Sequence, residues 1–484
     1  MASKVHSLQP RSDAFSATGV QSALRFDQLA ISAEVICDFI AAAIGLIGAY
    51  GIYRLLGLGR GIVYTPRILV LSTFIFAVLF VIMLDREGVY RRGSGMLRIS
   101  ETERILRVSV QAFFLLLPVA ILAAHLLSRW LLGISFFLTP MVVVTEKQLL
   151  FSAVRYLHSR GRGVRKAIIY GAGFTGKRIF SVLLRSRKLG ICPVVFVDDD
   201  ESVVGKTIYT LGYHREESAS VIRGPITSDL LREYGAEVIL AAIPSLSQDK
   251  LSVLASVAKD ANVLLTFVPT QDLYEDAWIT YVDIDGIILA KVSDSKSMLI
   301  YERAKRLIDI ILSVVALIIF SPLLIIIGMA VRMDSEGPAI FKQDRVGRDG
   351  KIFQIYKFRS MRVDSPVYEC HPQSAGDLRV TRVGRIIRKL SLDELPQLIN
   401  VIKGEMSLVG PRPEMPFIVD MYRPRERKRL SVTPGITGLW QLSADRSYPI
   451  HENPQYDLYY VRNRGFFMDI AILLHTVIFA IRGI

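Results

Sequence analysis

Two adjacent carboxylates, Asp393 and Glu394, lie in the segment LSLDELPQ at residues 390–397. Pro396 fits an α-helix only in its first turn, so we expect a helix to begin near Asp393 and to carry both carboxylates at its N-terminus. Backbone N–H groups and the helix dipole favour an incoming phosphate there. A carboxylate can attack phosphorus to form an acyl phosphate, and a neighbouring carboxylate can hold a divalent cation. Both residues are therefore candidate catalytic groups and candidate metal ligands.

The same dipeptide has a purely structural interpretation. Ser391 followed three positions later by Glu394 matches a capping box, and Asp is a common N-cap residue. On the dipeptide alone, capping is the simpler interpretation.

Basic residues nearby favour chemistry over capping. Arg412 lies between two prolines in the segment GPRP at residues 410–413, so its planar guanidinium is presented to phosphate oxygens at little cost in backbone entropy. Further positive charge comes from Lys357, Arg359 and Arg388. The carboxylates and these four basic residues together predict a phosphate-binding site.

A second candidate site is the glycine-rich segment GAGFTG at residues 171–176. It follows an expected strand at 166–170 and precedes an expected helix that runs through Leu184. Its glycines permit a tight turn, and the following helix N-terminus can hold a phosphate. The glycines of this weak cofactor-binding candidate are Gly171, Gly173 and Gly176.

Three further apolar segments complete an α/β doubly wound pattern, which we place at residues 165–275. The segment 193–197 ends at Asp198, where a ribose-binding acid would lie, and later strands are expected at 238–243 and 263–268. The residues leave open whether this Rossmann-like domain binds a nucleotide or is a structural or oligomerising domain.

Long apolar runs are expected to form membrane helices, which position these candidate sites relative to a membrane. Four runs in residues 29–151 are each near the ~20 residues that cross a bilayer as a helix. Basic clusters after the second and fourth runs place both ends of this four-helix bundle on the cytoplasmic side. Residues 1–28 are polar, without the apolar core of a signal peptide, and are expected to form a disordered cytoplasmic tail. The runs are roughly Leu29–Tyr53, Ile68–Leu84, Val108–Leu127 and Trp130–Phe151.

Glu34 and Asp38 lie one helical turn apart in the first run. Carboxylates inside a membrane span are either functional or face another helix, and the sequence leaves both interpretations open.

A fifth apolar run, Leu307–Val331, carries Ser321 and Pro322 in its middle. Proline removes a backbone donor there and bends or breaks the helix. Basic residues flank both ends, so a hairpin that returns to the cytoplasmic side and a kinked transmembrane helix are about equally compatible. For the last apolar run, Phe466–Ile481, we favour an interfacial helix, with packing onto the preceding domain as the alternative.

The composition agrees with a membrane location. Hydrophobic residues make up 51% of the 484 positions, yet Lys and Arg outnumber Asp and Glu by 59 to 45, for a net charge of +14. Such a balance is typical of a protein that works at an anionic membrane face on phosphate-bearing substrates, and we assign the charge to these rather than to nucleic acid. The chain is long enough for two or three domains.

Beyond residue 300 the chain resembles the bacterial polyprenyl-phosphate hexose-1-phosphate transferases, the monotopic phosphoglycosyl transferase superfamily. The resemblance rests on motifs that occur in order over about 180 residues. They are KRxxD at 305–309, Ser321-Pro322, KFRSM at 357–361, SLDELPQ at 391–397, GPRP at 410–413 and PGITG at 434–438. The N-terminal half is similar to the long form of this family, with four membrane helices and a nucleotide-binding-like domain.

The resemblance implies a membrane protein of mixed fold whose residues 300–484 form a re-entrant helix, broken at Ser321-Pro322, and an α+β catalytic domain. It implies that Asp393 forms a phosphosugar–enzyme intermediate with loss of UMP, while Glu394 helps to place Mg²⁺. Undecaprenyl phosphate would then attack this intermediate. The implied phosphate contacts are Lys357, Arg388, Arg412 and Arg446.

The family further implies a UDP-sugar donor, for which we expect glucose or galactose, and the first step of exopolysaccharide, capsule or O-antigen (lipopolysaccharide) assembly in the bacterial inner membrane. The chain reads LSADR at 442–446, where many members have a glycine before the arginine, and this departure bears on Arg446 and on sugar identity.

Two rival functions are compatible with parts of the chain. A membrane-bound nucleotide-sugar epimerase or dehydratase would use a Tyr-x-x-x-Lys pair, which Tyr301 and Lys305 mimic, but that pair lies outside the α/β domain. A non-enzymatic scaffold for polysaccharide export is the other. The oligomeric state stays open, a homodimer included.

Overall fold

The computed structural model describes residues 18–58, 62–90, 98–122, 128–185, 190–211, 216–243, 246–268, 278–284, 287–293, 298–363, 379–443 and 453–482. The chain divides into two compact units. Unit 1 comprises Met1–Met96 and Arg107–Lys296, and unit 2 comprises Leu97–Leu106 and Ser297–Ile484.

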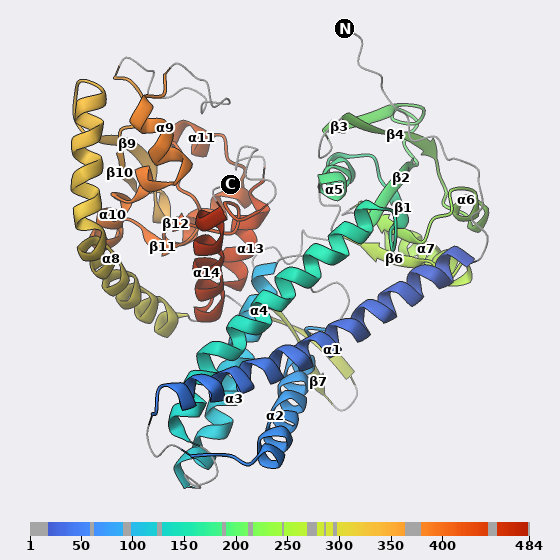
Figure 1. The fold of residues 1–484 in the computed structure, drawn as a ribbon. Helices are drawn as coiled ribbons and strands as arrows, with labels where there is room; N and C mark the ends of the chain where they lie inside the picture. The colour runs from blue at the N-terminus through green and yellow to red at the C-terminus, as the bar shows by residue number, and fades with distance from the viewer. Residues whose placement is uncertain are drawn as a thin grey trace. The chain divides into compact units, whose positions relative to one another are not determined.

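Four long helices occupy the N-terminal part, where the apolar runs were expected (Figure 1). These four and a later helix are long and apolar enough to cross a membrane. Helix α1 begins at Thr18, so the expectation that residues up to 28 belong to a disordered tail is wrong for 18–28. The helices are α1 (Thr18–Leu55), α2 (Pro66–Arg86), α3 (Arg98–Leu122) and α4 (Arg129–Ser159).

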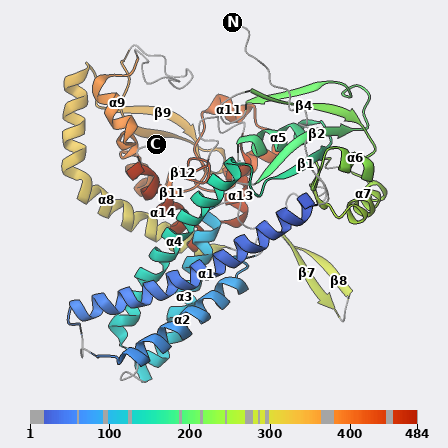
Figure 2. The same ribbon diagram turned by 45° about the vertical axis from the view of Figure 1, so that its right-hand side comes forward.

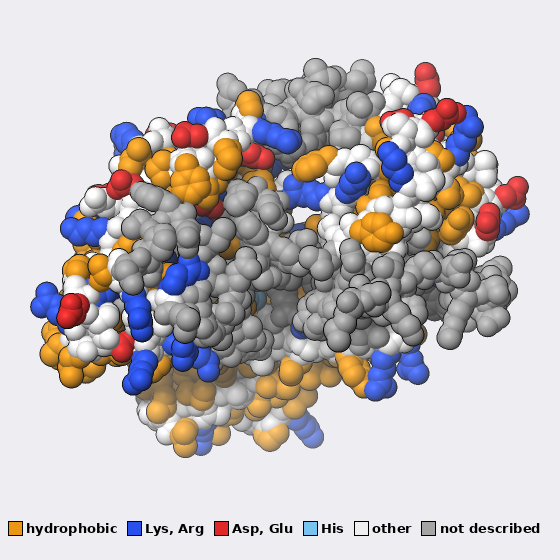
Figure 3. Space-filling view, turned by 90° about the horizontal axis from the view of Figure 1, so that it is seen from above, with side chains coloured by type: hydrophobic (Ala, Val, Ile, Leu, Met, Phe, Trp, Pro, Cys, Tyr) orange, Lys and Arg blue, Asp and Glu red, His pale blue; other side chains and the backbone are white. Residues whose placement is uncertain are grey.

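Small residues let α1 approach α4 closely. A Cβ at Gly45 would lie 2.7 Å from the Thr139 Cα, so only glycine fits at this crossing. Farther along, Ala49 and Tyr53 of α1 pack against Leu131 of α4 in one buried cluster. Away from such contacts, large apolar side chains lie exposed, and Figure 3 shows apolar side chains beside Lys and Arg side chains on one face of the molecule. This is the pattern of helices whose outer surface faces lipid.

The α/β domain of unit 1 is built on a six-stranded sheet of order β3-β4-β2-β1-β5-β6. All neighbouring strands are parallel except β3 and β4, which pair antiparallel. The strands at the glycine-rich segment, at Asp198 and at the two later positions were expected, whereas β3 and β4 were not. The strands are β1 (Arg165–Tyr170), β2 (Ile191–Asp198), β3 (Thr207–Leu211), β4 (Glu216–Arg223), β5 (Val238–Ala241) and β6 (Leu264–Phe267).

Helices cover both faces of this sheet (Figures 1 and 2). Ile169 of β1 packs with Phe180 of α5 on one face, and Ile168 packs with residues of α6 and α7 on the other. Successive residues of a strand point to opposite faces, which explains why the buried strands are continuously apolar. The helices are α5 (Phe174–Arg185), α6 (Ser228–Glu233) and α7 (Gln248–Asp260), and an antiparallel hairpin of β7 (Trp278–Ile284) and β8 (Ile287–Ser293) follows.

The C-terminal segment of unit 2 begins with the long helix α8 (Leu299–Asp334), which stays helical across Pro322 and bends along its length (Figure 1). The hydroxyl of Ser321 donates to the Ile318 carbonyl, one turn before it. A bend or a break was expected at Ser321-Pro322, and the helix continues through both residues, so the expected break is wrong. Both the re-entrant hairpin and the kinked span remain compatible with a bent helix.

Short elements follow α8 and form the rest of unit 2. They are β9 (Ile340–Val346), η2 (Arg348–Gly350), β10 (Ile352–Phe358), α9 (Arg382–Lys389), η3 (Leu392–Glu394), α10 (Gln397–Lys403), β11 (Ser407–Val409), α11 (Pro416–Asp420), α12 (Pro424–Arg427), η4 (Lys428–Ser431), β12 (Gly435–Thr437), α13 (Gln455–Asn463) and α14 (Phe466–Arg482). Strands β9 and β10 pair antiparallel, and β11 and β12 pair parallel.

Buried polar side chains tie these short elements together. Asn400 of α10 accepts from the Tyr356 N–H at 3.0 Å and donates to the Gln354 carbonyl at 2.7 Å, which fixes α10 against β10. Asp309 of α8 accepts from the Ser407 hydroxyl at 2.7 Å and so holds β11. Because these groups are buried, an unmatched partner would be destabilising, and the network fixes the segment between α10 and β11.

Helix α14 packs onto this unit by one face. Met468, Ala471 and Ile472 are buried with Val409 and Tyr460, as in the alternative that the sequence left open. An interfacial position for its exposed side stays a prediction.

Candidate active site

The turn that carries the two carboxylates is not the helix start that the sequence predicted. Asp393 and Glu394 lie in the 3₁₀ turn η3, and α10 begins only at Gln397. Ser391 adopts a left-handed conformation, with φ 54° and ψ 22°, and its side chain makes no capping hydrogen bond. The capping-box interpretation is therefore wrong. A left-handed serine is strained relative to the common regions, and such strain clusters at functional sites.

One carboxylate oxygen of Glu394 contacts cations from two other segments. Its Oε1 accepts from Lys357 Nζ of β10 at 2.7 Å and from Arg412 Nη2 at 3.4 Å. Burial alone would raise the pKa of Glu394, but Lys357 and Arg412 overcome it and lower this pKa to about 2. The Glu394 carboxylate is therefore ionised at any physiological pH.

Asp393 has a different environment from its neighbour. Within the described residues it forms no hydrogen bond or ion pair with another side chain. Burial raises its pKa, with a further increase from the Glu394 charge, while Lys357 and Arg388 of α9 act against that increase. Adjacent carboxylates with opposite pKa shifts are a signature of divided catalytic roles. Of the two carboxylates, Asp393 is therefore the one whose oxygens no other side chain binds within the described residues.

Arg412 is held by its backbone as well as by its proline neighbours. Its carbonyl accepts a hydrogen bond from Arg429 Nη2 at 2.8 Å. The carbonyl of Pro411 accepts from the Gly435 N–H at 2.8 Å. The carbonyl of Pro413 accepts from Arg345 Nη1 at 3.2 Å. The Arg412 guanidinium carbon also lies 6.0 Å from the centre of the Trp440 ring, within the range of a cation–π contact. Arg345, Arg429 and Trp440 were not singled out from the sequence.

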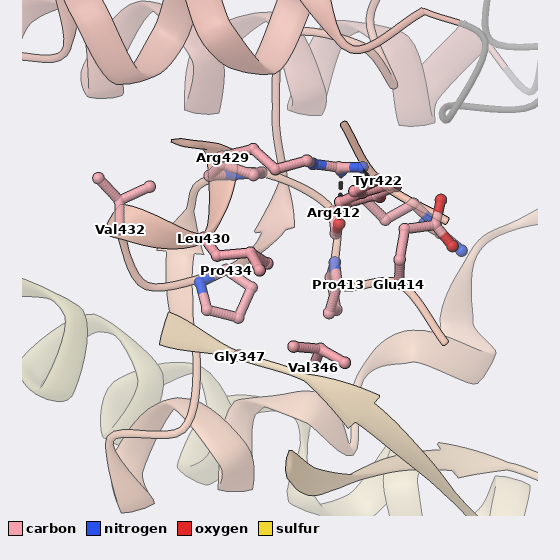
Figure 4. Close-up of a pocket in the computed structure, with 11 residues that line it drawn as sticks. Val346, Gly347, Arg412, Pro413, Glu414, Tyr422, Arg429, Leu430, Val432 and Pro434 are labelled. Atoms are coloured by element: carbon pink, nitrogen blue, oxygen red, sulfur yellow. Dashed lines mark hydrogen bonds between the residues drawn. The ribbon is translucent and has the colours of Figure 1, made fainter. Parts of the chain in front are cut away.

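Figure 4 shows the guanidinium of Arg429 over the backbone of Arg412, above a small pocket that Pro413, Leu430 and Pro434 line. The loop residues Pro411 and Arg412 line the pocket as well. Arg429 is thus part of the support of the site rather than of its open surface.

Arg359 contacts a different part of unit 2 from this group. Arg359 is buried and donates to the carbonyl and hydroxyl of Ser335, at 2.7 and 3.0 Å, at the end of α8. Its other guanidinium nitrogens have no partner within the described residues. Arg446 lies outside the described residues. The phosphate-binding roles of Arg359 and Arg446 stay predictions.

The donor set suits a magnesium ion that arrives with a substrate. Within the described residues, no group of three or more His, Cys, Asp or Glu residues could hold a metal by itself. Mg²⁺ is commonly bound by one or two carboxylates together with substrate phosphates and water. Asp393 and Glu394 are the two carboxylates present here, and magnesium binding by them stays a prediction.

The glycine-rich loop has the expected backbone geometry. Gly171 has φ 105°, and a Cβ at Gly176 would overlap the Gly171 carbonyl, so both positions require glycine. Asp198 accepts from the Ala172 N–H at 2.6 Å and from the Asp200 N–H at 2.9 Å. These bonds fasten the loop to β2 and leave further lone pairs on the carboxylate. Nucleotide binding here stays a prediction.

Glu34 and Asp38 of α1 face another helix. Lys147 of α4 donates to Glu34 Oε1 at 2.5 Å and to Asp38 Oδ2 at 2.7 Å, and the Tyr90 hydroxyl donates to Asp38 at 2.8 Å. Asp38 and Lys147 are almost completely buried. The pair is therefore part of a helix–helix contact, the second of the two interpretations that the sequence allowed.

Tyr301 and Lys305 both contact Asp469 of α14, at 2.7 and 2.8 Å. This contact lies within unit 2, whereas an epimerase or dehydratase would need the pair beside a dinucleotide in the α/β domain. The structure therefore gives no support to that rival.

Comparison with known proteins shows the family to which the chain belongs. Residues 300–483 match the family model described as bacterial sugar transferase. The chain is 33% identical over 338 residues to the undecaprenyl-phosphate galactose phosphotransferase of Salmonella typhimurium, covering 66% of this chain and 69% of that protein. It is 34% identical over 283 residues to the UDP-glucose:undecaprenyl-phosphate glucose-1-phosphate transferase of Klebsiella pneumoniae, covering 56% and 61%.

A third relative, the UDP-N-acetylgalactosamine-undecaprenyl-phosphate N-acetylgalactosaminephosphotransferase of Aeromonas hydrophila, is 41% identical over 184 residues, covering 37% of this chain and 44% of that protein. The chain belongs to the bacterial sugar transferase family. It is a phosphoglycosyl transferase of the polyprenyl-phosphate hexose-1-phosphate type, as its motifs predicted.

Proposed function

We propose that this enzyme transfers glucose-1-phosphate or galactose-1-phosphate from a UDP-sugar to undecaprenyl phosphate, through a covalent phosphosugar intermediate on Asp393. The observation that carries the proposal is the contrast within the dyad. Glu394 is neutralised by Lys357 and Arg412, while the neighbouring Asp393 has no side-chain partner within the described residues. Relatives named for galactose and glucose transfer to this lipid support the substrate classes.

The proposed reaction has two balanced steps. In the first, an Asp393 oxygen attacks the phosphorus that bears the sugar, and the bond from that phosphorus to the bridging oxygen breaks. The electron pair of that bond leaves with UMP. In the second, a phosphate oxygen of undecaprenyl phosphate attacks the same phosphorus and displaces Asp393, which regenerates the free carboxylate. The product is a sugar-diphosphate lipid.

The surrounding residues have distinct parts in these steps. Arg412 and Arg388 bind and orient phosphate oxygens, and Lys357 keeps Glu394 ionised and fixed. Mg²⁺, held by Asp393 and Glu394 with the substrate phosphates, would supply charge neutralisation.

We place the enzyme in the bacterial inner membrane, with unit 2 on the cytoplasmic face and α8 re-entrant, at the start of exopolysaccharide, capsule or O-antigen assembly. Single cysteines introduced at Arg303 and Glu336, near the two ends of α8, test the topology. A re-entrant helix exposes both to a cytoplasmic thiol reagent. Labelling from opposite sides of the membrane would show a full span.

The decisive experiment measures UMP release by nanodisc-embedded protein with Mg²⁺ and either UDP-glucose or UDP-galactose. Without lipid acceptor, we expect a burst of at most about one UMP per enzyme with the correct donor, because the intermediate forms but cannot turn over. Adding undecaprenyl phosphate then gives continuous release. UMP release only after lipid is added would show direct transfer instead.

The matched variants are Asp393→Asn and Asp420→Asn, the second at an exposed position of α11. We expect Asp393→Asn to lose the burst and at least ~10³-fold in turnover, since the amide is not a nucleophile. Because the folded-state pKa of Asp393 is raised, its ionised form opposes folding at neutral pH, so the amide should not destabilise the protein. Retained turnover in Asp393→Asn would exclude the covalent mechanism.

A further inference from the structure

The loop that presents Arg412 depends on donors from outside it. Pro411 and Pro413 have no backbone N–H, so the loop has few donors with which to hold itself. Its three consecutive carbonyls instead accept from Gly435, Arg429 and Arg345. The carbonyl of Arg412 itself is the one that Arg429 holds.

Arg429 reaches this carbonyl from the buried side of the loop. Its side chain is only 2% exposed, and it contacts three acceptors at once: the Arg412 carbonyl, the Tyr422 hydroxyl and the carboxylate of Asp457 on α13. Asp457 is 1% exposed and forms an ion pair with Arg429. A buried guanidinium needs such a counter-charge, because removing either partner leaves the other charge uncompensated.

The contacts connect this buried pair to the reacting groups through one residue. Asp457 orients Arg429, Arg429 fixes the backbone of Arg412, and the Arg412 guanidinium binds Glu394 next to Asp393. A lysine at position 429 could keep the charge but lacks the rigid fork of donors with which the guanidinium contacts these three acceptors. The geometry thus requires arginine at this position.

We propose that Arg429, oriented by Asp457, is a positioning residue for the transfer reaction, which it supports by fixing the backbone of Arg412. The proposal rests on the proposed function of the Asp393 site. Arg429 touches no reacting atom, so its effect must pass through Arg412, and this dependence separates positioning from a general contribution to folding.

A double-mutant cycle between Arg429→Lys and Arg412→Lys tests this dependence, with kcat/KM for the UDP-sugar as the readout. In the wild-type background we expect Arg429→Lys to lower kcat/KM by about 10- to 100-fold, the size of effect that a misplaced group produces. In the Arg412→Lys background, the same change should lower it by less than about threefold. Asp457→Asn should behave like Arg429→Lys in both backgrounds.

The matched control is Arg306→Lys. Arg306 also clamps backbone carbonyls, those of Val401 and Ile402 at the end of α10, but it does not contact the Arg412 loop. We expect this variant to lower the thermal midpoint by an amount similar to Arg429→Lys while kcat/KM stays within about twofold of wild type. Equal losses of activity in the two variants would show a purely structural role.

Additive effects in the cycle would also overturn the proposal, because they would mean that Arg429 acts independently of Arg412. Wild-type protein is assayed in the same preparation. If it released no UMP, the proposed function would fail, and this inference would fall with it. Active wild-type protein with an additive cycle would overturn the inference alone.

Discussion

In the membrane part of the chain, Glu34 and Asp38 share Lys147, whereas in unit 2 Asp393 and Glu394 lie beside Lys357. In both places two carboxylates close in sequence receive a lysine from a distant element. The lysine of the first group binds both carboxylates. The lysine of the second binds only Glu394, and Arg412 binds the same oxygen.

The difference supports the proposed distinction between a structural charge cluster and a catalytic one. Where the ammonium bridges both carboxylates, the charges join two helices and the groups are unavailable for chemistry. Where the cations converge on one carboxylate, the oxygens of its neighbour have no side-chain partner within the described part of the chain. The predictions below test this distinction in order of decreasing expected effect.

The largest effect is expected at the membrane cluster. Lys147→Met leaves Glu34 and Asp38 without a counter-charge in a buried contact, and we expect it to destabilise the protein by about 3–5 kcal/mol. Thermal unfolding in nanodiscs measures this loss, while turnover per folded molecule should be unchanged. The triple variant Lys147→Met, Glu34→Gln, Asp38→Asn, which removes the unpaired charges, should recover most of the stability. An unstable triple variant would show that packing rather than charge holds the two helices.

Lys357→Met should show the opposite behaviour. Glu394 keeps Arg412 as a partner, so the thermal midpoint should change little, but the charge balance of the dyad is lost. We expect kcat/KM to fall about 100-fold, equivalent to ~2.7 kcal/mol. The comparison with Lys147→Met is direct, since both changes remove one buried ammonium. If Lys357→Met lowered the stability of the protein rather than its turnover, both charge clusters would be structural.

The smallest effect is in the pH dependence. In the proposed mechanism Asp393 attacks in its ionised form, and its pKa is raised. We therefore expect kcat/KM to fall about tenfold per pH unit as pH decreases below that pKa. Glu394, with a pKa of about 2, stays ionised throughout the accessible range. Lys357 lowers the pKa of Asp393, so in Lys357→Met the acid limb should move to higher pH. An acid limb at the same pH in both proteins would assign it to another group.

The sequence predicts the elements whose signal is local. Hydrophobic length places the membrane helices, and continuously apolar strands place β1, β2, β5 and β6. The Asp393–Glu394 pair is recognisable because two carboxylates are adjacent in the sequence. Arg412 is recognisable because it lies between two prolines.

The sequence cannot predict partners that the fold brings from far away. Lys147 lies 109 positions from Asp38, and Asp457 lies 28 from Arg429, with no local feature to connect them. At Ser391, a local rule gave the wrong answer, because tertiary contacts to Glu394 outweigh the capping box. Arg359 shares a motif with Lys357, yet it contacts Ser335 instead of the dyad. Near the end of a strand, a difference of two positions is enough to change the partner.

The proline-flanked loop that carries Arg412 should also open in a characteristic way. Pro411 and Pro413 carry no amide hydrogen, and the loop carbonyls are held by donors from separate elements, so it cannot fray one residue at a time. Breaking its support should expose the Gly435 N–H, which donates to the Pro411 carbonyl. Hydrogen exchange at the Gly435 amide would therefore report how often the loop opens. Pro411 and Pro413 have no amide hydrogen, so they give no exchange signal of their own.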